Sequence, residues 1–191
     1  AMATPVMTAR GAEFRKVMAN LNSGLRYAFD LSPSKPEMKT HSWTGEDGYR
    51  VVVVSGSGTA AMEMVIANRF RNNDLVLVPT NGKFGERVAD ICRQFCNVKQ
   101  LQYEWGRSFD LYELEQQLER GCYEALLICH NETSSGITQD AEAIAEMCER
   151  HGVSFILDGI TSVGGMPVHP AKWKAEAVVM GAQKCTAGPS G

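Results

Sequence analysis

The chain has 191 residues, of which 44% are hydrophobic, and a formal net charge of −3. This suits one globular domain, or one domain plus a fragment, with a real core. Lysine and arginine are scattered without a basic stripe, which excludes nucleic-acid binding. No apolar run approaches the length of a membrane span and the N-terminus lacks a signal-like apolar core, so we expect a cytoplasmic protein that does not enter a membrane. The six cysteines are spread along the chain, which favours reduced thiols over a disulfide framework.

Helix-like and strand-like segments alternate along the chain. An amphipathic helix is predicted within residues 1–30, and a loop over residues 31–48, which contain two prolines, two glycines and many polar residues. Beyond it, short apolar runs recur with helical periodicity between them, the pattern of successive βα units. The predicted fold class is therefore α/β, a three-layer, mostly parallel sheet with helices on both faces. The predicted strands are Val51–Val54, Leu75–Val78, Val98–Leu101, Ala125–Cys129, Ser154–Leu157 and Val178–Met180, and the predicted helices lie near residues 59–70, 84–96, 110–120 and 139–151.

The first predicted strand runs through a glycine-rich turn into a helix. Free backbone N–H groups at the helix start, with the hydroxyls of Ser57 and Thr59 around Gly58, would form a cradle for an anion such as a phosphate. The glycine spacing also matches the dinucleotide fingerprint, but that alternative requires an acidic residue at the end of the second strand, where the chain has Val78-Pro79-Thr80. The Gly-Lys-Ser/Thr ending of a nucleoside-triphosphate loop is also missing.

Aromatic and polar residues follow two other predicted strands. Phe84, between two glycines, could lay its ring on a planar ligand or could anchor the core at a helix start, and its spacing leaves both open. Hydrogen-bonding residues of 129–137, Thr133 among them, follow the fourth strand, where open α/β sheets bind ligands. Within this stretch we favour a structural part for His130 over a functional one.

Asp158 and Lys184 each follow a short apolar run, as expected of two neighbouring buried strands that bring polar side chains to one edge of a sheet. An amine and a carboxylate there suit pyridoxal 5'-phosphate. The lysine would bind the cofactor aldehyde as a Schiff base, and the carboxylate would keep the pyridine nitrogen protonated. Gln183, beside the lysine, is either a loop residue without a functional role or a hydrogen-bond donor to the phosphate. Cys92 and Cys96 share a helix face, but without a second pair of ligands no metal site is predicted.

Together these motifs resemble the class V aminotransferases of the fold-type I pyridoxal-phosphate enzymes, specifically the alanine–glyoxylate and serine–pyruvate aminotransferase group. The resemblance runs from about Arg10 to Gly191 and rests on five motifs in the family's order: Ser-Gly-Ser-Gly-Thr-Ala-Ala-Met-Glu, Gly-Lys-Phe-Gly-Glu-Arg, His-Asn-Glu-Thr-Ser-Ser-Gly, Asp-Gly-Ile-Thr-Ser-Val-Gly-Gly and Gln-Lys-Cys.

The resemblance implies a part for each residue of the site. Lys184 would form the Schiff base and Asp158 would partner the ring nitrogen. Phe84 would stack on the ring, at a position where relatives often carry Trp or Tyr, and Ile160 would pack against the other ring face. Thr133 would reach the ring hydroxyl or the substrate. The phosphate would be held by Ser57, Gly58, Thr59 and Gln183.

The implied activity is transamination between a small amino acid (alanine or serine) and a small 2-keto acid (glyoxylate or pyruvate), in a homodimer. Transamination of 2-aminoethylphosphonate with pyruvate, or of ureidoglycine with glyoxylate, is an alternative that the motifs do not separate. Family members are much longer, so the resemblance implies that residues 31–191 are a partial large domain, and that the small domain and the arginine for the substrate carboxylate are absent. We therefore expect residues 1–191 alone to be catalytically silent. The alternative from another class is a non-catalytic half-domain that acts with a partner chain.

Overall fold

The computed structural model describes residue 8 and residues 10–33 and 45–189, so most of the loop predicted over residues 31–48 lies outside the described residues. The chain divides into two compact units, Ala1–Val53 and Val54–Gly191. None of the helices in the described part of the chain combines the length and the apolar character that a bilayer span requires.

The N-terminal unit contains one long helix and a buried ion pair. Helix α1 (Ala12–Ala28) lies within the predicted N-terminal helix. Near its end, Arg26 donates to both carboxylate oxygens of Asp47, at 2.7 and 2.6 Å, and Ser32 also donates to this carboxylate. Burial by itself would raise the pKa of Asp47, but the hydrogen bonds from Arg26, Ser32 and Tyr49 outweigh it and lower the pKa to about 2.

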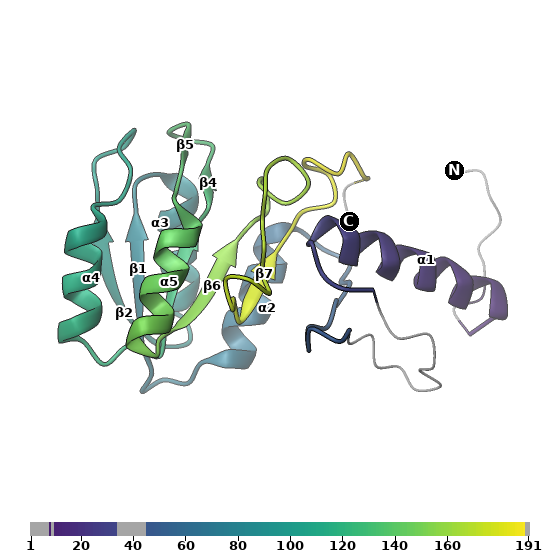
Figure 1. Ribbon diagram of the computed structural model, residues 1–191, viewed down its shortest axis with the longest axis horizontal. Coiled ribbons are helices and arrows are strands. Elements are labelled where there is room, and N and C mark those ends of the chain that lie inside the picture. The colour runs from purple at the N-terminus through teal and green to yellow at the C-terminus, as the bar shows by residue number, and fades with distance from the viewer. Residues whose placement is uncertain (1–7, 9, 34–44, 190–191) are drawn as a thin grey trace. The chain divides into compact units, whose positions relative to one another are not determined.

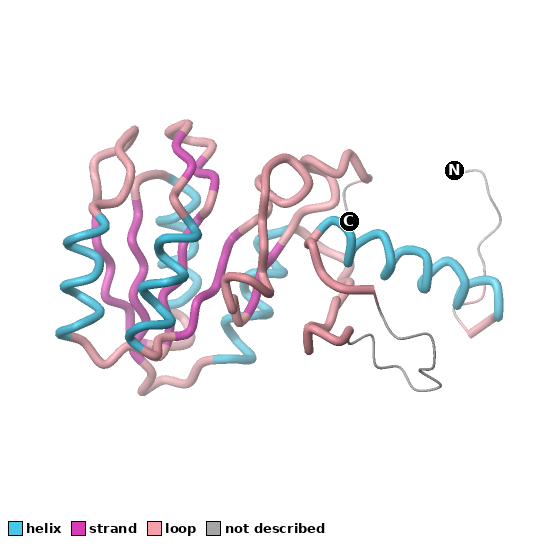
Figure 2. The backbone as a smooth tube through the Cα atoms, viewed as in Figure 1, coloured by secondary structure: helices cyan, strands magenta, loops and turns pink. Residues whose placement is uncertain are grey.

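The C-terminal unit is built on a five-stranded sheet in the order β2-β1-β3-β6-β7, in which every pairing is parallel. Figure 1 shows α4 and α5 in front of this sheet and α2 and α3 behind it, and Figure 2 shows the same helices flanking the strands. The three-layer α/β fold predicted from the sequence is therefore confirmed. Its strands are β1 (Leu75–Thr80), β2 (Asn97–Gln102), β3 (Ala125–Cys129), β6 (Ser154–Asp158) and β7 (Ala177–Val179), and its helices are α2 (Gly58–Arg69), α3 (Lys83–Cys92), α4 (Leu111–Arg120) and α5 (Ala141–His151).

Apolar residues of the strands are buried on both faces of the sheet, as in parallel sheets generally. On one face, Met62 and Ile66 of α2 and Val88 of α3 pack with alternate strand residues such as Val76 and Leu127. The intervening strand residues belong to the opposite face, because side chains alternate along a strand. This packing fixes the register that matters for the site, in which Cys129 pairs with Asp158 and Asp158 pairs with Val179.

The structure corrects three details of the sequence prediction. Val51–Val54 is not a buried strand: Val52, Val53 and Val54 are 61%, 51% and 40% exposed, and no described strand pairs with them. Helix α3 ends at Cys92 rather than near residue 96, because the N–H groups of Gln94 and Phe95 bond three residues back, to the carbonyls of Ile91 and Cys92, instead of four residues back. The polar stretch after β3 contains a small antiparallel hairpin that was not predicted, formed by β4 (Asn131–Glu132) and β5 (Ile137–Thr138).

Candidate active site

A cavity of about 190 Å³ lies at the carboxyl ends of β3 and β6 and at the N-terminus of α2. One water molecule needs roughly 10–15 Å³ of such space, so the cavity has room for much more than a single water molecule. All of the site residues predicted from the sequence line it. They are Ser57, Gly58, Thr59, Phe84, Thr133, Asp158, Ile160, Gln183 and Lys184.

Further residues that the sequence did not single out complete the lining. Most of them lie inside or beside the motifs already quoted, so their position in the chain was the available signal. They are Met62, Arg87, Val88, Ile91, Cys129, Asn131 and Thr161.

The N-terminus of α2 presents backbone donors to the cavity. Ser57 is the N-cap, and its hydroxyl accepts from the N–H of Ala60 at 3.1 Å. The N–H groups of Gly58 and Thr59 have no acceptor among the described residues. A helix N-terminus with free N–H groups attracts anions, because the helix dipole adds to the donors. Gly56, just upstream, has φ +153°, a value that L residues rarely adopt.

Gly58 also lets the α2 terminus approach Ile160 closely. A Cβ atom at Gly58 would lie 2.6 Å from Cδ1 of Ile160 and 2.9 Å from its Cγ1. A larger residue would therefore push the isoleucine away from its place in the cavity wall. The absence of a side chain at Gly58 thus leaves room for Ile160 in the cavity wall.

Asp158 ends β6 and is buried, with 7% of its surface exposed. One carboxylate oxygen accepts from the N–H of Ile160 at 3.0 Å. Burial raises the pKa of Asp158 to about 6, the hydrogen bond from Ile160 opposes this shift, and the nearby negative charge of Glu132 adds to it. A carboxylate in these surroundings gains from a cationic or proton-donating group placed against it.

Lys184 lies in a turned segment that follows β7, the strand beside β6. The segment is held by backbone and side-chain contacts: the N–H of Lys184 donates to the carbonyl of Gly181, and the thiol of Cys185 donates to the carbonyl of Thr161 at 3.2 Å. The Nζ atom of Lys184 has no ion pair or hydrogen bond with any residue that the structure describes. The prediction that two neighbouring strands bring Asp158 and Lys184 to one edge of the sheet agrees with this arrangement.

Phe84 stands in the first turn of α3 and is half-buried. Its ring lies in the cavity wall, with the guanidinium of Arg87 over it at 5.8 Å from the ring centroid. Phe84 lines the cavity from the first turn of α3, a position that fits both alternatives left open by the sequence. Phe84 and Ile160 belong to the largely apolar wall of this cavity and suit a flat ring.

His130 belongs to the structural core, as favoured from the sequence. It is buried, does not line the cavity, and packs edge-on against Trp173 with ring centroids 5.9 Å apart. Burial lowers the pKa of His130 to about 4, so it is neutral at neutral pH. Cys92 and Cys96 are both buried, and in the part of the chain that the structure covers no three His, Cys, Asp or Glu side chains are grouped to hold a metal ion.

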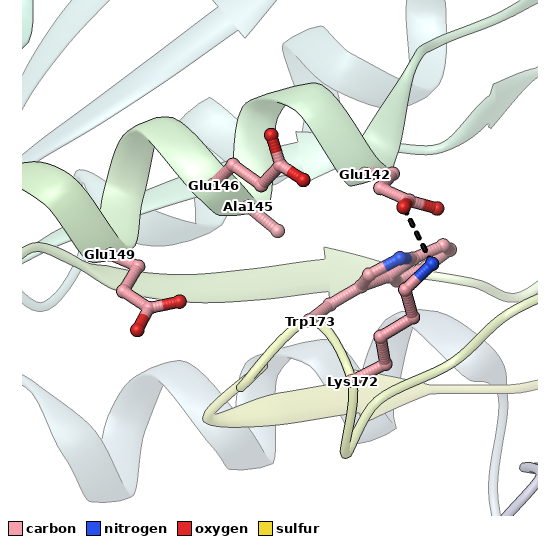
Figure 3. Close-up of a pocket in the computed structure, with 6 residues that line it drawn as sticks. All are labelled: Glu142, Ala145, Glu146, Glu149, Lys172 and Trp173. Carbon is pink, nitrogen blue, oxygen red and sulfur yellow. Dashed lines mark hydrogen bonds and ion pairs between the residues drawn. The ribbon is translucent and has the colours of Figure 1, made fainter.

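A second, much smaller cleft lies between α5 and the segment around Trp173 (Figure 3). Its volume is about 30 Å³, and an ion pair of 2.6 Å joins Lys172 to Glu142 at one end. It has room for only a few water molecules, and none of the predicted site residues line it. The larger cavity is therefore the candidate site.

Comparison with known proteins identifies the family. Residues 4–191 match the family described as aminotransferase class-V. The chain belongs to the class V aminotransferase family. It is 33% identical over 139 residues to the (S)-ureidoglycine–glyoxylate transaminase of Bacillus subtilis, which covers 72% of this chain and 33% of that protein. It is 33% identical over 180 residues to the alanine–glyoxylate aminotransferase of Rattus norvegicus, covering 94% of this chain and 40% of that protein.

Solved structures of this family agree with the fold. The crystal structure of an alanine–glyoxylate aminotransferase from Nostoc sp. superposes with a TM-score of 0.86 at 30% identity, covering 100% of this chain and 47% of that one. The chain thus spans less than half the length of these relatives.

Proposed function

We propose that this chain forms the cofactor-binding part of a pyridoxal-phosphate-dependent aminotransferase that moves an amino group between a small amino acid and a small 2-keto acid. One observation carries the proposal. An amine, Lys184 in the segment after β7, and a buried carboxylate, Asp158 at the end of the neighbouring β6, line the same cavity as the free N–H groups at the start of α2. We further propose, from the resemblance, that residues 31–191 belong to a large domain and that the protein acts as a homodimer.

The residues present fit this cofactor at three points. The N–H groups of Gly58 and Thr59 suit a phosphate, and the lack of a Cβ atom at Gly58 leaves room for Ile160 beside them. The apolar side chains of Phe84 and Ile160 suit a flat ring. The raised pKa of Asp158 marks a carboxylate that would be stabilised by a protonated ring nitrogen.

When bound, pyridoxal phosphate supplies an aldehyde that combines with amines and a ring that accepts electrons. The chain's own residues would do the rest. Lys184 would hold the aldehyde carbon and, once released by the incoming amino acid, would use its Nζ atom to take and return the α-proton. Asp158 would keep a proton on the ring nitrogen, and Gln183 would add a donor for the phosphate. Thr133 would bond to the ring hydroxyl or to the substrate.

The two named relatives support glyoxylate as the amino acceptor, and the Rattus relative supports alanine as the donor. Serine as the donor rests on the resemblance. Ureidoglycine is supported by the Bacillus relative, and 2-aminoethylphosphonate with pyruvate stays a further alternative. Assaying alanine, serine, ureidoglycine and 2-aminoethylphosphonate against glyoxylate and pyruvate would rank these pairs. A protein that binds the cofactor and turns over none of them would favour the non-catalytic alternative.

The test measures cofactor absorbance and transamination in the protein and in two lysine variants. We expect added pyridoxal phosphate to give a protein-bound visible absorbance band, and we expect Lys184→Ala to abolish the band and to reduce transamination by at least about a hundredfold, the scale of a lost general base. Lys172→Ala is the matched control, because Lys172 is an exposed lysine outside the cavity. An unchanged band and rate in Lys184→Ala would overturn the proposal.

A further inference from the structure

Glu132 is a fully buried carboxylate that does not line the cavity, with 0% of its surface exposed. One oxygen, Oε2, accepts from the backbone N–H of Phe84 at 3.0 Å and of Gly85 at 2.8 Å. The other, Oε1, accepts from the N–H of Ser134 at 3.1 Å and from its hydroxyl at 2.5 Å. Glu132 therefore bonds at once to the start of α3 and to its own loop.

These bonds cap α3 from a distant part of the chain. The first N–H groups of a helix have no partner inside it, and the N-cap residue Gly82 has no side chain to offer. Glu132 accepts from the groups of Phe84 and Gly85, and the hydroxyl of Ser134 accepts from that of Lys83 at 2.8 Å. A negative charge at this terminus is also favoured by the helix dipole.

The contact between Glu132 and α3 is close because Gly82 makes room for it. A Cβ atom at Gly82 would lie 2.4 Å from Cγ and 2.5 Å from Cδ of Glu132. Glu132 also stands between Asn131 and Thr133, which both line the cavity. One buried carboxylate thus connects the segment of Phe84 to the segment of Thr133.

We propose that Glu132 is a positioning residue that holds Phe84 and Thr133 in place around the cofactor ring; this rests on the proposed function. A buried charge is costly unless its hydrogen bonds are satisfied. Here three backbone N–H groups and the hydroxyl of Ser134 satisfy them. The negative charge of Glu132 also contributes to the raised pKa of Asp158, after the larger contribution of burial. Loss of the Glu132 side chain would loosen the ring-binding side of the cavity, where Phe84 and Thr133 lie. The phosphate cradle at the start of α2 would stay intact.

The experiment compares Glu132→Ala and Glu132→Gln in a Lys184→Ala background, so that cofactor binding is non-covalent. Titration calorimetry measures the affinity for pyridoxal phosphate and, separately, for inorganic phosphate. We expect Glu132→Ala to bind pyridoxal phosphate about tenfold more weakly or worse, the scale of lost hydrogen bonds to a charged group, with phosphate affinity unchanged. Glu132→Gln keeps an acceptor oxygen for Phe84 and Gly85 and should stay within about threefold of the parent.

The matched control is Asp110→Ala, which removes the N-cap of another helix. Asp110 accepts from the N–H groups of Tyr112 and Glu113 at 3.0 and 3.1 Å and does not line the cavity. Asp110→Ala should lower thermal stability without changing either affinity. Hydrogen exchange of the Phe84 and Gly85 amides, measured in the ligand-free protein, should speed up in Glu132→Ala and not in the control.

Each other outcome decides against one of the two proposals. The part assigned to Glu132 would be overturned if Glu132→Ala bound pyridoxal phosphate as tightly as the parent, or if it lost affinity for inorganic phosphate to the same extent. It would also be overturned if Asp110→Ala lost as much affinity for pyridoxal phosphate as Glu132→Ala. A parent protein that binds phosphate but no pyridoxal phosphate would instead overturn the proposed function. If Glu132→Ala does not fold, Ser134→Ala, which removes one donor to the same carboxylate, should weaken pyridoxal phosphate binding about threefold, and no loss there would overturn the proposal.

Discussion

The buried Asp158 carboxylate should destabilise the ligand-free protein at neutral pH. The pKa of Asp158 is about 6 in the folded protein and 3.8 without the surroundings of the site. The folded state therefore holds this proton more tightly than the unfolded state, so its stability falls as the pH rises from about 4 through 6. Linkage gives a loss of about 3 kcal/mol at pH 7.5 and about half of that at pH 5.

The perturbation is Asp158→Asn, which removes the charge and keeps an oxygen that can accept from the N–H of Ile160. We expect the variant to gain stability relative to the parent, and the gain to be about 1.4 kcal/mol larger at pH 7.5 than at pH 5. In a chain of this size that difference corresponds to about 3–6 °C in Tm. Any fixed cost of burying the new amide group is the same at both values of pH.

The assay is thermal or urea unfolding of parent and variant, both freed of bound ligand, at the two pH values. Transamination by the same variant should fall far more than its cofactor affinity, since only the charge that favours a protonated ring is lost. A stability difference that does not change with pH would refute the reasoning, because it would mean that Asp158 is already charged without cost in the folded protein.

Two further predictions concern single contacts. Gly58→Ala should weaken binding of inorganic phosphate and pyridoxal phosphate about tenfold by calorimetry, because its Cβ atom would lie 2.6 Å from Ile160. The double variant with Ile160→Ala should recover phosphate binding. An unchanged affinity in the single variant would contradict the proposed phosphate cradle. Asp47→Ala should destabilise the N-terminal unit by about 3–5 kcal/mol near pH 7, because it leaves Arg26 buried without its carboxylate. The folded pKa of Asp47 is lowered from 3.8 to about 2, so about 2 kcal/mol of this stability is present above about pH 4 and is lost as the pH falls through 2. The difference in unfolding free energy between parent and variant, measured with urea, should therefore shrink in acid, and a constant difference would contradict it.

The sequence predicted most of the fold because each βα unit has its own local pattern. The motif residues line one cavity, as expected, since the carboxyl ends of neighbouring parallel strands share one edge of the sheet. The strand predicted over Val51–Val54 was wrong, because an apolar run does not indicate which strand, if any, pairs with it. The capping of α3 by Glu132 could not be predicted, because it joins residues 47 and 48 positions apart through tertiary contacts that leave no periodic signal in the chain.

The most direct test of the central claim is to locate the bound cofactor on the chain. The protein is incubated with pyridoxal phosphate, reduced with borohydride, digested, and mapped by mass spectrometry. We predict that the added mass is found on the peptide containing Lys184, and that Lys184→Ala removes it. Label on Lys83, the exposed lysine at the start of α3, or no specific label at all, would contradict the account.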